Sequence, residues 1–122
     1  VLGDCYKMQV YELAKYINRS KEIIPVHIIT KAPSAELRPD QKDSDSLPAY
    51  ETLDQILFQY IEKRADPASI KALGFDSALV DKTLKMVNTN EYKRNQFCPI
   101  IRISPKAFGV GRRVPIVAKY LN

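Results

Sequence analysis

The chain has 122 residues, and its 45% hydrophobic and 27% charged residues are typical of a globular domain, which excludes a disordered tail. No apolar run approaches the roughly 18 residues that cross a membrane, so we expect no membrane span and a cytoplasmic protein. The net charge is +5, and its distribution is uneven. Residues 1–91 carry 12 Lys and Arg against 14 Asp and Glu, whereas the tail of residues 92–122 carries 7 Lys and Arg and no acid. This basic tail suits an anionic partner (nucleotide phosphates, a nucleic acid or an acidic protein surface), unless it is simply a solvated face.

The first predicted element is an amphipathic helix over residues 4–18. Its apolar residues recur at i, i+3, i+4 and i+7, and they are Val10, Leu13, Ala14 and Ile17. We expect Asp4 to cap this helix, which places Lys7 in the first turn. The helix dipole disfavours a cation there by about 0.3–1 kcal/mol, and a bound phosphate would reverse that sign. A solvated lysine is the alternative.

A short apolar segment, residues 23–29, comes next and is interrupted by Pro25. We expect a connector or a brief strand, because proline cannot donate to a ladder. The polar loop over residues 31–50 contains three prolines, and loops of this length are usually functional or disordered. Lys31, Ser34 and Glu36 open it, and a cation, a hydroxyl and a carboxylate so close together could serve a triphosphate and its Mg²⁺. A stiff turn in which Ser34 bonds its own backbone is the alternative.

Three further helices are predicted downstream. The second amphipathic helix covers residues 49–64, and its apolar stripe is Tyr50, Leu53, Ile56, Leu57, Tyr60 and Ile61. The third covers residues 67–73, with Asp66 as its cap and Gly74 as its stop. The fourth begins after a cap at Asp76 and continues, or restarts at Asn88 or Asn90, to about Gln96.

The end of the fourth helix combines two cations with an aromatic ring in Tyr92, Lys93 and Arg94. Such a group can bind phosphate and stack on a ring, or it can be an exposed amphipathic face. The tail from Cys98 onward contains three prolines and two glycines, so we expect it to be mostly irregular. Cys98 and Cys5 lack metal-ligand spacing, and we expect both to be free thiols.

Residues 65–86 have the outline of a helix-turn-helix, which together with the positive charge favours a nucleic-acid-binding module as an alternative. The second helix of that outline, however, begins at Asp76 and carries Asp81, and it offers no Arg, Asn or Gln before Asn88. Acidic residues there would repel phosphates, so we expect no nucleic-acid partner. No glycine-rich phosphate loop, hydrolase triad or zinc signature is present, and we therefore assign no catalytic residue and no metal ligand.

Five blocks of the sequence, in this order and spacing, resemble the end of the synthetase domain of NAD synthetases. They are Leu2–Tyr11, Lys31–Pro39, Asp43–Pro48, Asn90–Arg94 and Ser104–Gly109, and together they extend over nearly the whole chain. The last block and residues 111–116 are similar to the longer glutamine-dependent type, which carries a nitrilase-like glutaminase domain upstream. The resemblance implies an α/β, adenine nucleotide alpha hydrolase-like domain with a parallel sheet. Residues 1–122 are expected to be its C-terminal piece, itself mainly α.

The resemblance also implies a reaction and a set of contacts. The family amidates deamido-NAD to NAD with ammonia derived from glutamine, and it uses ATP, Mg²⁺ and an adenylated intermediate. By position, Lys7 and Ser34 would contact ATP, while Tyr92 and Lys93 would contact deamido-NAD, although the family often has His where Tyr92 stands. The loop over residues 31–50 matches a mobile segment that closes over the substrates, and its possible contacts are Lys31, Asp43 and Asp45.

The family's Ser-Gly-Gly-x-Asp-Ser loop, which binds pyrophosphate, is absent from the sequence, as is the acidic residue that helps hold Mg²⁺. Both would lie before Val1, so we expect Mg²⁺ to be bound mainly upstream and the isolated chain to be inactive. The expected partners are ATP, deamido-NAD, the upstream glutaminase and synthetase regions, and further copies in a homo-oligomer. A pure assembly module, in which the basic tail packs on another subunit, is an alternative that is compatible with the ligase.

Overall fold

The computed structural model describes residues 2–34, 37–43, 47–94, 96–106 and 114–115. Within these residues every regular element is a helix, which confirms the predicted mainly α character. The helices are α1 (Lys7–Ile17), α2 (Val26–Thr30), α3 (Tyr50–Ile61), α4 (Pro67–Ala72), α5 (Ser77–Thr89) and α6 (Glu91–Arg94). None of them is long and apolar enough to cross a membrane.

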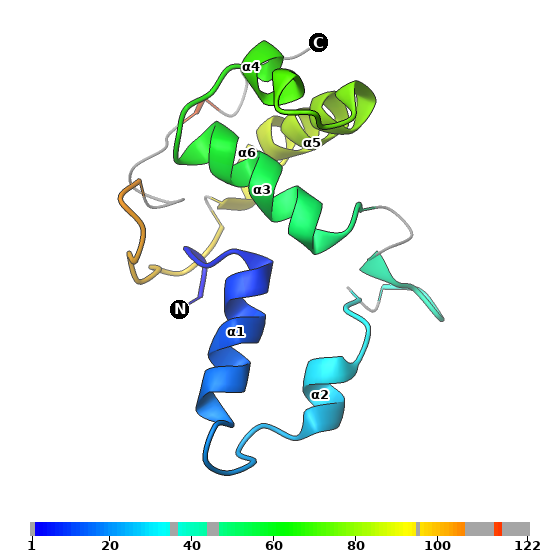
Figure 1. The fold of residues 1–122 in the computed structure, drawn as a ribbon, viewed down its shortest axis with the longest axis vertical. Coiled ribbons are helices and arrows are strands. Elements are labelled where there is room, and N and C mark those ends of the chain that lie inside the picture. Colours follow the sequence, from blue (N-terminus) through cyan, green and yellow to red (C-terminus); the bar gives the residue numbers. More distant parts are fainter. Residues whose placement is uncertain (1, 35–36, 44–46, 95, 107–113, 116–122) are drawn as a thin grey trace.

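The helices form two groups (Figure 1). The α3, α4 and α5 helices contact one another and form a packed unit, with α6 against α5. The α1 and α2 helices project away from this unit as an arm, which is joined to it where α1 meets α3. The segment of residues 96–106 runs back from the packed unit to the turn that precedes α1.

The hydrophobic core lies entirely in the packed unit. Its fully buried side chains are Ile56 on α3, Ile70 on α4, and Val80 and Leu84 on α5. Partly buried side chains cover this cluster, and they are Tyr60, Ala65, Phe75 and Leu79. Neither α1 nor α2 contains a fully buried residue. The apolar stripe of α1 therefore does not by itself make a second core.

Local hydrogen bonds set the ends of α4 and α5 as the sequence predicts. The Asp66 carboxylate accepts the backbone N–H groups of Ala68 and Ser69 at 3.0 and 3.1 Å, and Asp76 accepts that of Leu79 at 2.8 Å. Gly74 ends α4 with φ +94°, a left-handed conformation that favours glycine. Both caps and the glycine stop are confirmed.

The prediction that Asp4 caps the first helix is wrong. Its side chain is only 6% exposed, and the carboxylate accepts the backbone N–H groups of Ile103 and Ser104 at 2.8 and 2.7 Å and the Ser104 hydroxyl at 3.0 Å. A Cβ atom on Gly3 would lie 2.5 Å from Ile100, so only glycine allows this close approach. Asp4 thus holds the tail against the turn before α1.

The start of α1 is stabilised by another helix. The Asp54 carboxylate of α3 accepts the backbone N–H of Met8 at 2.8 Å, and Gln9 accepts that of Tyr6 at 2.9 Å. A carboxylate beside the first turn of a helix satisfies an otherwise unpaired donor and interacts favourably with the helix dipole. Lys7 is the first residue of α1, so its predicted place in the first turn is confirmed.

The expected connector or brief strand at residues 23–29 is also wrong, because residues 26–30 form α2. Pro25 precedes the helix, where its missing N–H has no cost, and Glu22 accepts the backbone N–H of Val26 at 3.0 Å. Asn18 organises the turn between the two helices by accepting the N–H groups of Ile23 and Ile24 at 3.0 and 2.9 Å. Pro25 therefore marks the start of a helix and not an interruption in a strand.

Candidate functional site

Lys7 is half-buried between two tyrosine rings. Its ammonium nitrogen lies 5.1 Å from the ring centre of Tyr11, which follows it by one turn of α1, and 5.7 Å from that of Tyr50 at the start of α3. Within the described part of the chain, no ion pair involves Lys7. Lys7 and Tyr50 line a cavity of about 240 Å³ between the N-terminal turn and α3. The other charged residues that line this cavity are the acids Asp4, Asp54 and Glu62, so Lys7 is the one cation among its described lining residues.

Tyr50 also connects this lysine to the long loop. Its hydroxyl donates to the Asp43 carboxylate at 2.5 Å, and the backbone N–H of Asp43 donates to the carbonyl of Pro33 at 2.9 Å. Burial raises the pKa of the Tyr50 phenol above its ordinary value, and the hydrogen bond to Asp43 raises it further. The phenol therefore stays protonated and remains a donor at neutral pH.

The loop itself encloses a basic hollow. Its lining includes Lys31, Ser34, Arg38 and Lys42, with Asp40 as the one acid among the lining residues that the structure describes. Two bonds shape the turn inside it: Gln41 donates its backbone N–H to the carbonyl of Arg38 at 3.3 Å, and its side chain accepts that of Leu37 at 3.0 Å. The predicted contacts Lys31 and Ser34 thus lie at one hollow, and the lining residues that the structure describes carry more cations than acids.

Tyr92 and Lys93 lie on α6 with exposed side chains. The residue before them, Glu91, is only 4% exposed and forms an ion pair with Arg94. Lys93 itself is exposed, and among the described residues it forms no ion pair. Neither Tyr92 nor Lys93 lines the cavity beside Lys7 or the hollow of the loop.

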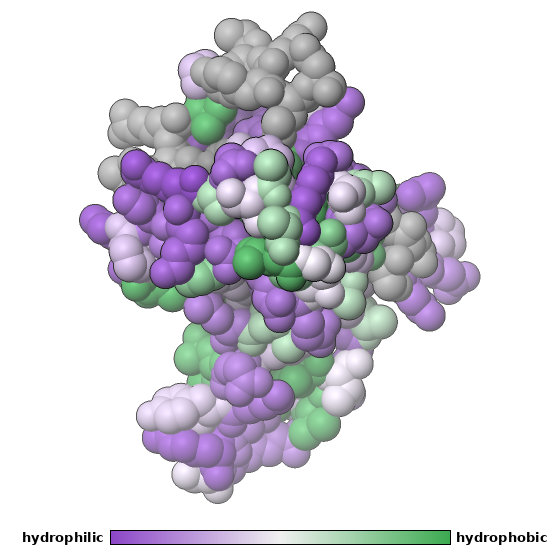
Figure 2. Space-filling view, turned by 45° about the horizontal axis from the view of Figure 1, so that its top comes forward, coloured by the Kyte–Doolittle hydropathy of each residue, from purple (hydrophilic) through white to green (hydrophobic). Residues whose placement is uncertain are grey.

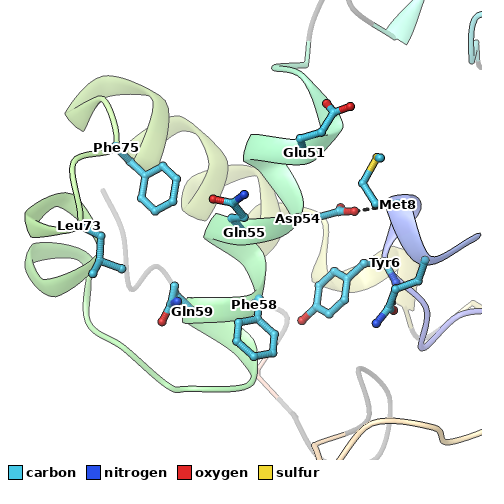
Figure 3. Close-up of a pocket in the computed structure, with 10 residues that line it drawn as sticks. Tyr6, Met8, Glu51, Asp54, Gln55, Phe58, Gln59, Leu73 and Phe75 are labelled. Carbon is cyan, nitrogen blue, oxygen red and sulfur yellow. Dashed lines mark hydrogen bonds between the residues drawn. The ribbon is translucent and has the colours of Figure 1, made fainter. Parts of the chain in front are cut away.

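A third cavity, which sequence reasoning missed, lies between the start of α1, the outer face of α3 and the turn after α4 (Figure 3). Tyr6 and Phe58 meet edge to face across it with ring centres 6.4 Å apart, and the Asp54–Met8 hydrogen bond closes one side. Its other lining residues are Gln9, Glu51, Gln55, Gln59, Leu73 and Phe75. The available signal was Phe58, a large aromatic residue that lies off the apolar stripe of its helix.

The structure therefore joins some of the predicted contacts and separates others. Lys7 and Asp43 meet through Tyr50, and Lys31 and Ser34 share the loop hollow. Tyr92 and Lys93 stand apart on α6, and Asp45 lies outside the described residues. Three residues that sequence reasoning did not assign to a contact prove to organise the region, namely Tyr50, Asp54 and Glu91.

The acids in α5 that argued against nucleic-acid binding have structural roles. Asp76 caps the helix, and Asp81 forms a 2.7 Å ion pair with Lys71 of α4. Cys5 and Cys98 are free thiols. Among the described residues, no group of three or more His, Cys, Asp or Glu side chains has an arrangement that could hold a metal ion.

Comparison with known proteins adds to this geometry. Residues 1–97 match the family model described as NAD synthase. The glutamine-dependent NAD(+) synthetase of Acinetobacter baylyi is 55% identical over 119 residues, which cover 96% of this chain and 22% of that protein. That of Thermotoga maritima is 46% identical over 122 residues, with coverages of 98% and 21%.

A solved structure is also similar, that of the glutamine-dependent NAD+ synthetase from Acinetobacter baumannii in complex with adenosine diphosphate. It is 43% identical to this chain with a TM-score of 0.57, and the match covers 93% of this chain and 19% of the solved chain. The helical arrangement described above therefore occurs within a larger protein. The chain spans about a fifth of the length of the relatives it matches.

Proposed function

We propose that this chain, which belongs to the NAD synthase family, is the C-terminal portion of a glutamine-dependent NAD synthetase. In this proposal, the chain forms part of the surface that binds ATP and deamido-NAD. The names of its relatives and the adenosine diphosphate in a similar structure support this proposal. Since the chain spans about a fifth of those relatives, we assign the pyrophosphate-binding loop and the glutaminase to the rest of the protein.

The observation that carries the proposal is the setting of Lys7. A cation in the first turn of a helix is unfavourable by itself, and here it has no ion pair within the described residues. An ATP phosphate placed against it would remove this penalty, and a charge-assisted hydrogen bond contributes about 1.5–3 kcal/mol. The hollow that contains Lys31 and Ser34 supplies further cations on the loop.

In the proposed reaction, the nicotinate carboxylate of deamido-NAD attacks the α-phosphorus of ATP, and pyrophosphate leaves. Ammonia then attacks the adenylated carboxyl carbon, and AMP leaves with NAD as the product. Lys7 and Ser34 hold the ATP phosphates in this scheme, whereas Lys93 and Tyr92 hold deamido-NAD. Holding both substrates converts an encounter of two anions into a reaction within one complex.

Mg²⁺ would neutralise phosphate charge in this reaction, but the described residues do not offer a set of ligands that fits it. We propose that Mg²⁺ is bound mainly by residues upstream of this chain. We further infer that the protein works in the cytoplasm as a homo-oligomer, with the basic tail of residues 92–122 packing on the rest of the assembly.

The test is an assay of the full-length enzyme that contains this chain. With deamido-NAD, ATP, Mg²⁺ and ammonia it should form NAD, AMP and pyrophosphate in equal amounts, and the isolated 122-residue chain should form none. Lys7→Ala should lower kcat/KM for ATP about ten- to a hundred-fold. Lys15→Ala is the matched control, because Lys15 lies on the same helix and pairs with Glu12 at the surface. A full-length protein that forms no NAD would refute the proposed function.

A further inference from the structure

The start of α3 brings one aromatic side chain against both the proposed ATP contact Lys7 and the loop residue Asp43. The ring of Tyr50 lies 5.7 Å from the Lys7 ammonium nitrogen, and its hydroxyl donates to the Asp43 carboxylate at 2.5 Å. The ring centre of Tyr11, one turn further along α1, lies 5.1 Å from the same ammonium nitrogen. One tyrosine thus contacts the helix that carries Lys7 and the loop that carries Asp43.

We propose that Tyr50 is a positioning residue for ATP, whose ring fixes the Lys7 ammonium group and whose hydroxyl ties the loop of residues 31–50 to the start of α1. This role rests on the function proposed above, and neither the family comparison nor the sequence pattern assigns it. Tyr50 itself need not touch ATP, because it acts through Lys7 and Asp43.

The ring has a specific effect on a lysine. A lysine side chain has four flexible carbons, and ordering it against a phosphate costs conformational entropy. Two tyrosine faces hold the Lys7 ammonium group electrostatically without neutralising its charge. An acidic partner would instead cancel the charge that ATP needs. The aromatic setting therefore orders Lys7 and leaves it cationic.

The hydroxyl has a different effect, on the loop. The Asp43 carboxylate accepts the Tyr50 hydroxyl, and among the described residues Asp43 does not pair with Lys7. The phenol therefore gives this loop carboxylate a hydrogen-bond donor on α3. The backbone N–H of Asp43 also donates to Pro33, the residue before Ser34, so the same bond anchors the loop next to a second proposed ATP contact.

The same chain provides a control pair. Tyr16 and Arg19 form an aromatic–cation contact of 3.9 Å at the opposite end of α1. Tyr16 is 60% exposed, and among the described residues no hydrogen bond or ring contact joins it to the loop or to Lys7. If any tyrosine beside a cation on α1 supported ATP binding through general stability, Tyr16 and Tyr50 would behave alike.

The experiment uses steady-state kinetics of the full-length enzyme, with ATP and deamido-NAD varied separately. Tyr50→Leu should raise KM for ATP between about two-fold and thirty-fold, with a change of less than about two-fold for deamido-NAD. Tyr16→Leu should change neither value. In a Lys7→Ala background, Tyr50→Leu should raise KM for ATP by a smaller factor than it does in the wild-type background, because the effect of the ring acts through Lys7.

A second variant separates the ring from the hydroxyl. Tyr50→Phe keeps the ring over Lys7 and removes the donor to Asp43, so it should raise KM for ATP less than Tyr50→Leu does. Tyr50→Phe should have no effect in an Asp43→Ala background. If Tyr50→Leu does not fold, Tyr11→Leu replaces it with the same expectation, since Tyr11 contacts the same ammonium group.

Two results would overturn the inference while leaving the proposed function intact. One is an equal rise in KM for ATP and for deamido-NAD with Tyr50→Leu. The other is a rise in KM for ATP with Tyr50→Leu that is as large in the Lys7→Ala background as in the wild type. A wild-type enzyme that forms no NAD would refute the proposed function itself, so the two failures are distinguishable.

Discussion

The packed unit of α3, α4 and α5 and the arm of α1 and α2 differ in how they hold their structure. The packed unit has four fully buried apolar side chains, whereas neither helix of the arm has a fully buried residue. Apolar residues reach the surface on the projecting lower part of the molecule (Figure 2), and on the arm the exposed ones include Leu13, Ile23, Val26 and Ile28. The base of the arm is held by two carboxylates, through Asp54 to Met8 and Asp4 to Ser104, and by the edge-to-face contact of Tyr6 with Phe58.

The residues that stabilise the fold and the residues that are proposed to bind substrate therefore lie in different parts of the molecule. Lys7, which the proposed function places near ATP, lies on the arm, and Asp43 lies on the loop. The packed unit contributes Tyr50 and Asp54, which contact these two segments. Elements with few buried apolar contacts open at lower free energy, and regions that move on ligand binding come from this class. The geometry is consistent with a rigid unit that presents a less rigid binding arm.

The difference between the two regions predicts the largest loss of stability when a core side chain is shortened. Ile70→Ala should destabilise the full-length protein by about 2–5 kcal/mol, because Ile70 is fully buried and its loss leaves a cavity. Ile28→Ala in α2, where the side chain is 57% exposed, should cost about 0.5 kcal/mol or less. Urea unfolding of both variants checks this. Equal losses would mean that the rest of the protein covers the arm as fully as the packed unit covers its own core.

A second prediction concerns Lys93, the exposed cation of α6. Lys93→Ala should lower kcat/KM for deamido-NAD about ten- to a hundred-fold, through loss of a charge-assisted hydrogen bond worth about 1.5–3 kcal/mol. It should cost folding only about 0.5 kcal/mol, since the side chain is exposed and unpaired among the described residues. Lys85→Ala on the neighbouring α5 is the matched exposed control. Kinetics with deamido-NAD varied and thermal melting decide it, and an unchanged kcat/KM would remove Lys93 from the site.

A third prediction tests the base of the arm. Asp4→Ala should speed hydrogen exchange at the backbone amides of Ile103 and Ser104, because both donate to the Asp4 carboxylate. If loss of these hydrogen bonds lowers the free energy of local opening by about 1–3 kcal/mol, the two amides should exchange roughly five- to a hundred-fold faster. The amides of α5 are the internal reference and should keep their rates. Faster exchange in α5 as well would show that the tail contact supports the packed unit too.

The features that could be predicted from the sequence depend on neighbours along the chain. The caps at Asp66 and Asp76 and the stop at Gly74 act within three residues, and the apolar spacing of α3 predicts which face is buried. Lys7 was correctly placed in a first turn, although Asp4 was wrongly chosen as the cap.

The features that were missed depend on distant partners. Asp4 contacts residues 99 and 100 positions away, and Asp54 accepts a donor 46 positions away, so no local pattern shows either role. The spacing of Lys7 and Tyr11 on one face of a helix was visible in the sequence, but the approach of Tyr50 depends on how α3 packs against α1. The helix α2 was missed because a proline that breaks a strand can equally start a helix.

The smallest predicted effect concerns the protonation of Tyr50 where the arm and the packed unit meet. Burial and the hydrogen bond to Asp43 raise the pKa of this phenol, so the folded protein favours the protonated form. The resulting stabilisation is fully present below the ordinary tyrosine pKa of about 10, and it is lost as pH rises through the raised value. The effect of Tyr50→Phe on KM for ATP should therefore be constant between about pH 7 and 9. In a pH titration followed by phenolate absorbance, Tyr50→Phe should lack one of the tyrosines that ionise late. Tyr6, whose pKa burial also raises, should still ionise late. If the tyrosine missing from that variant had ionised at its ordinary pKa, the bond between Tyr50 and Asp43 would not persist in solution, and the loop would be free of the packed unit.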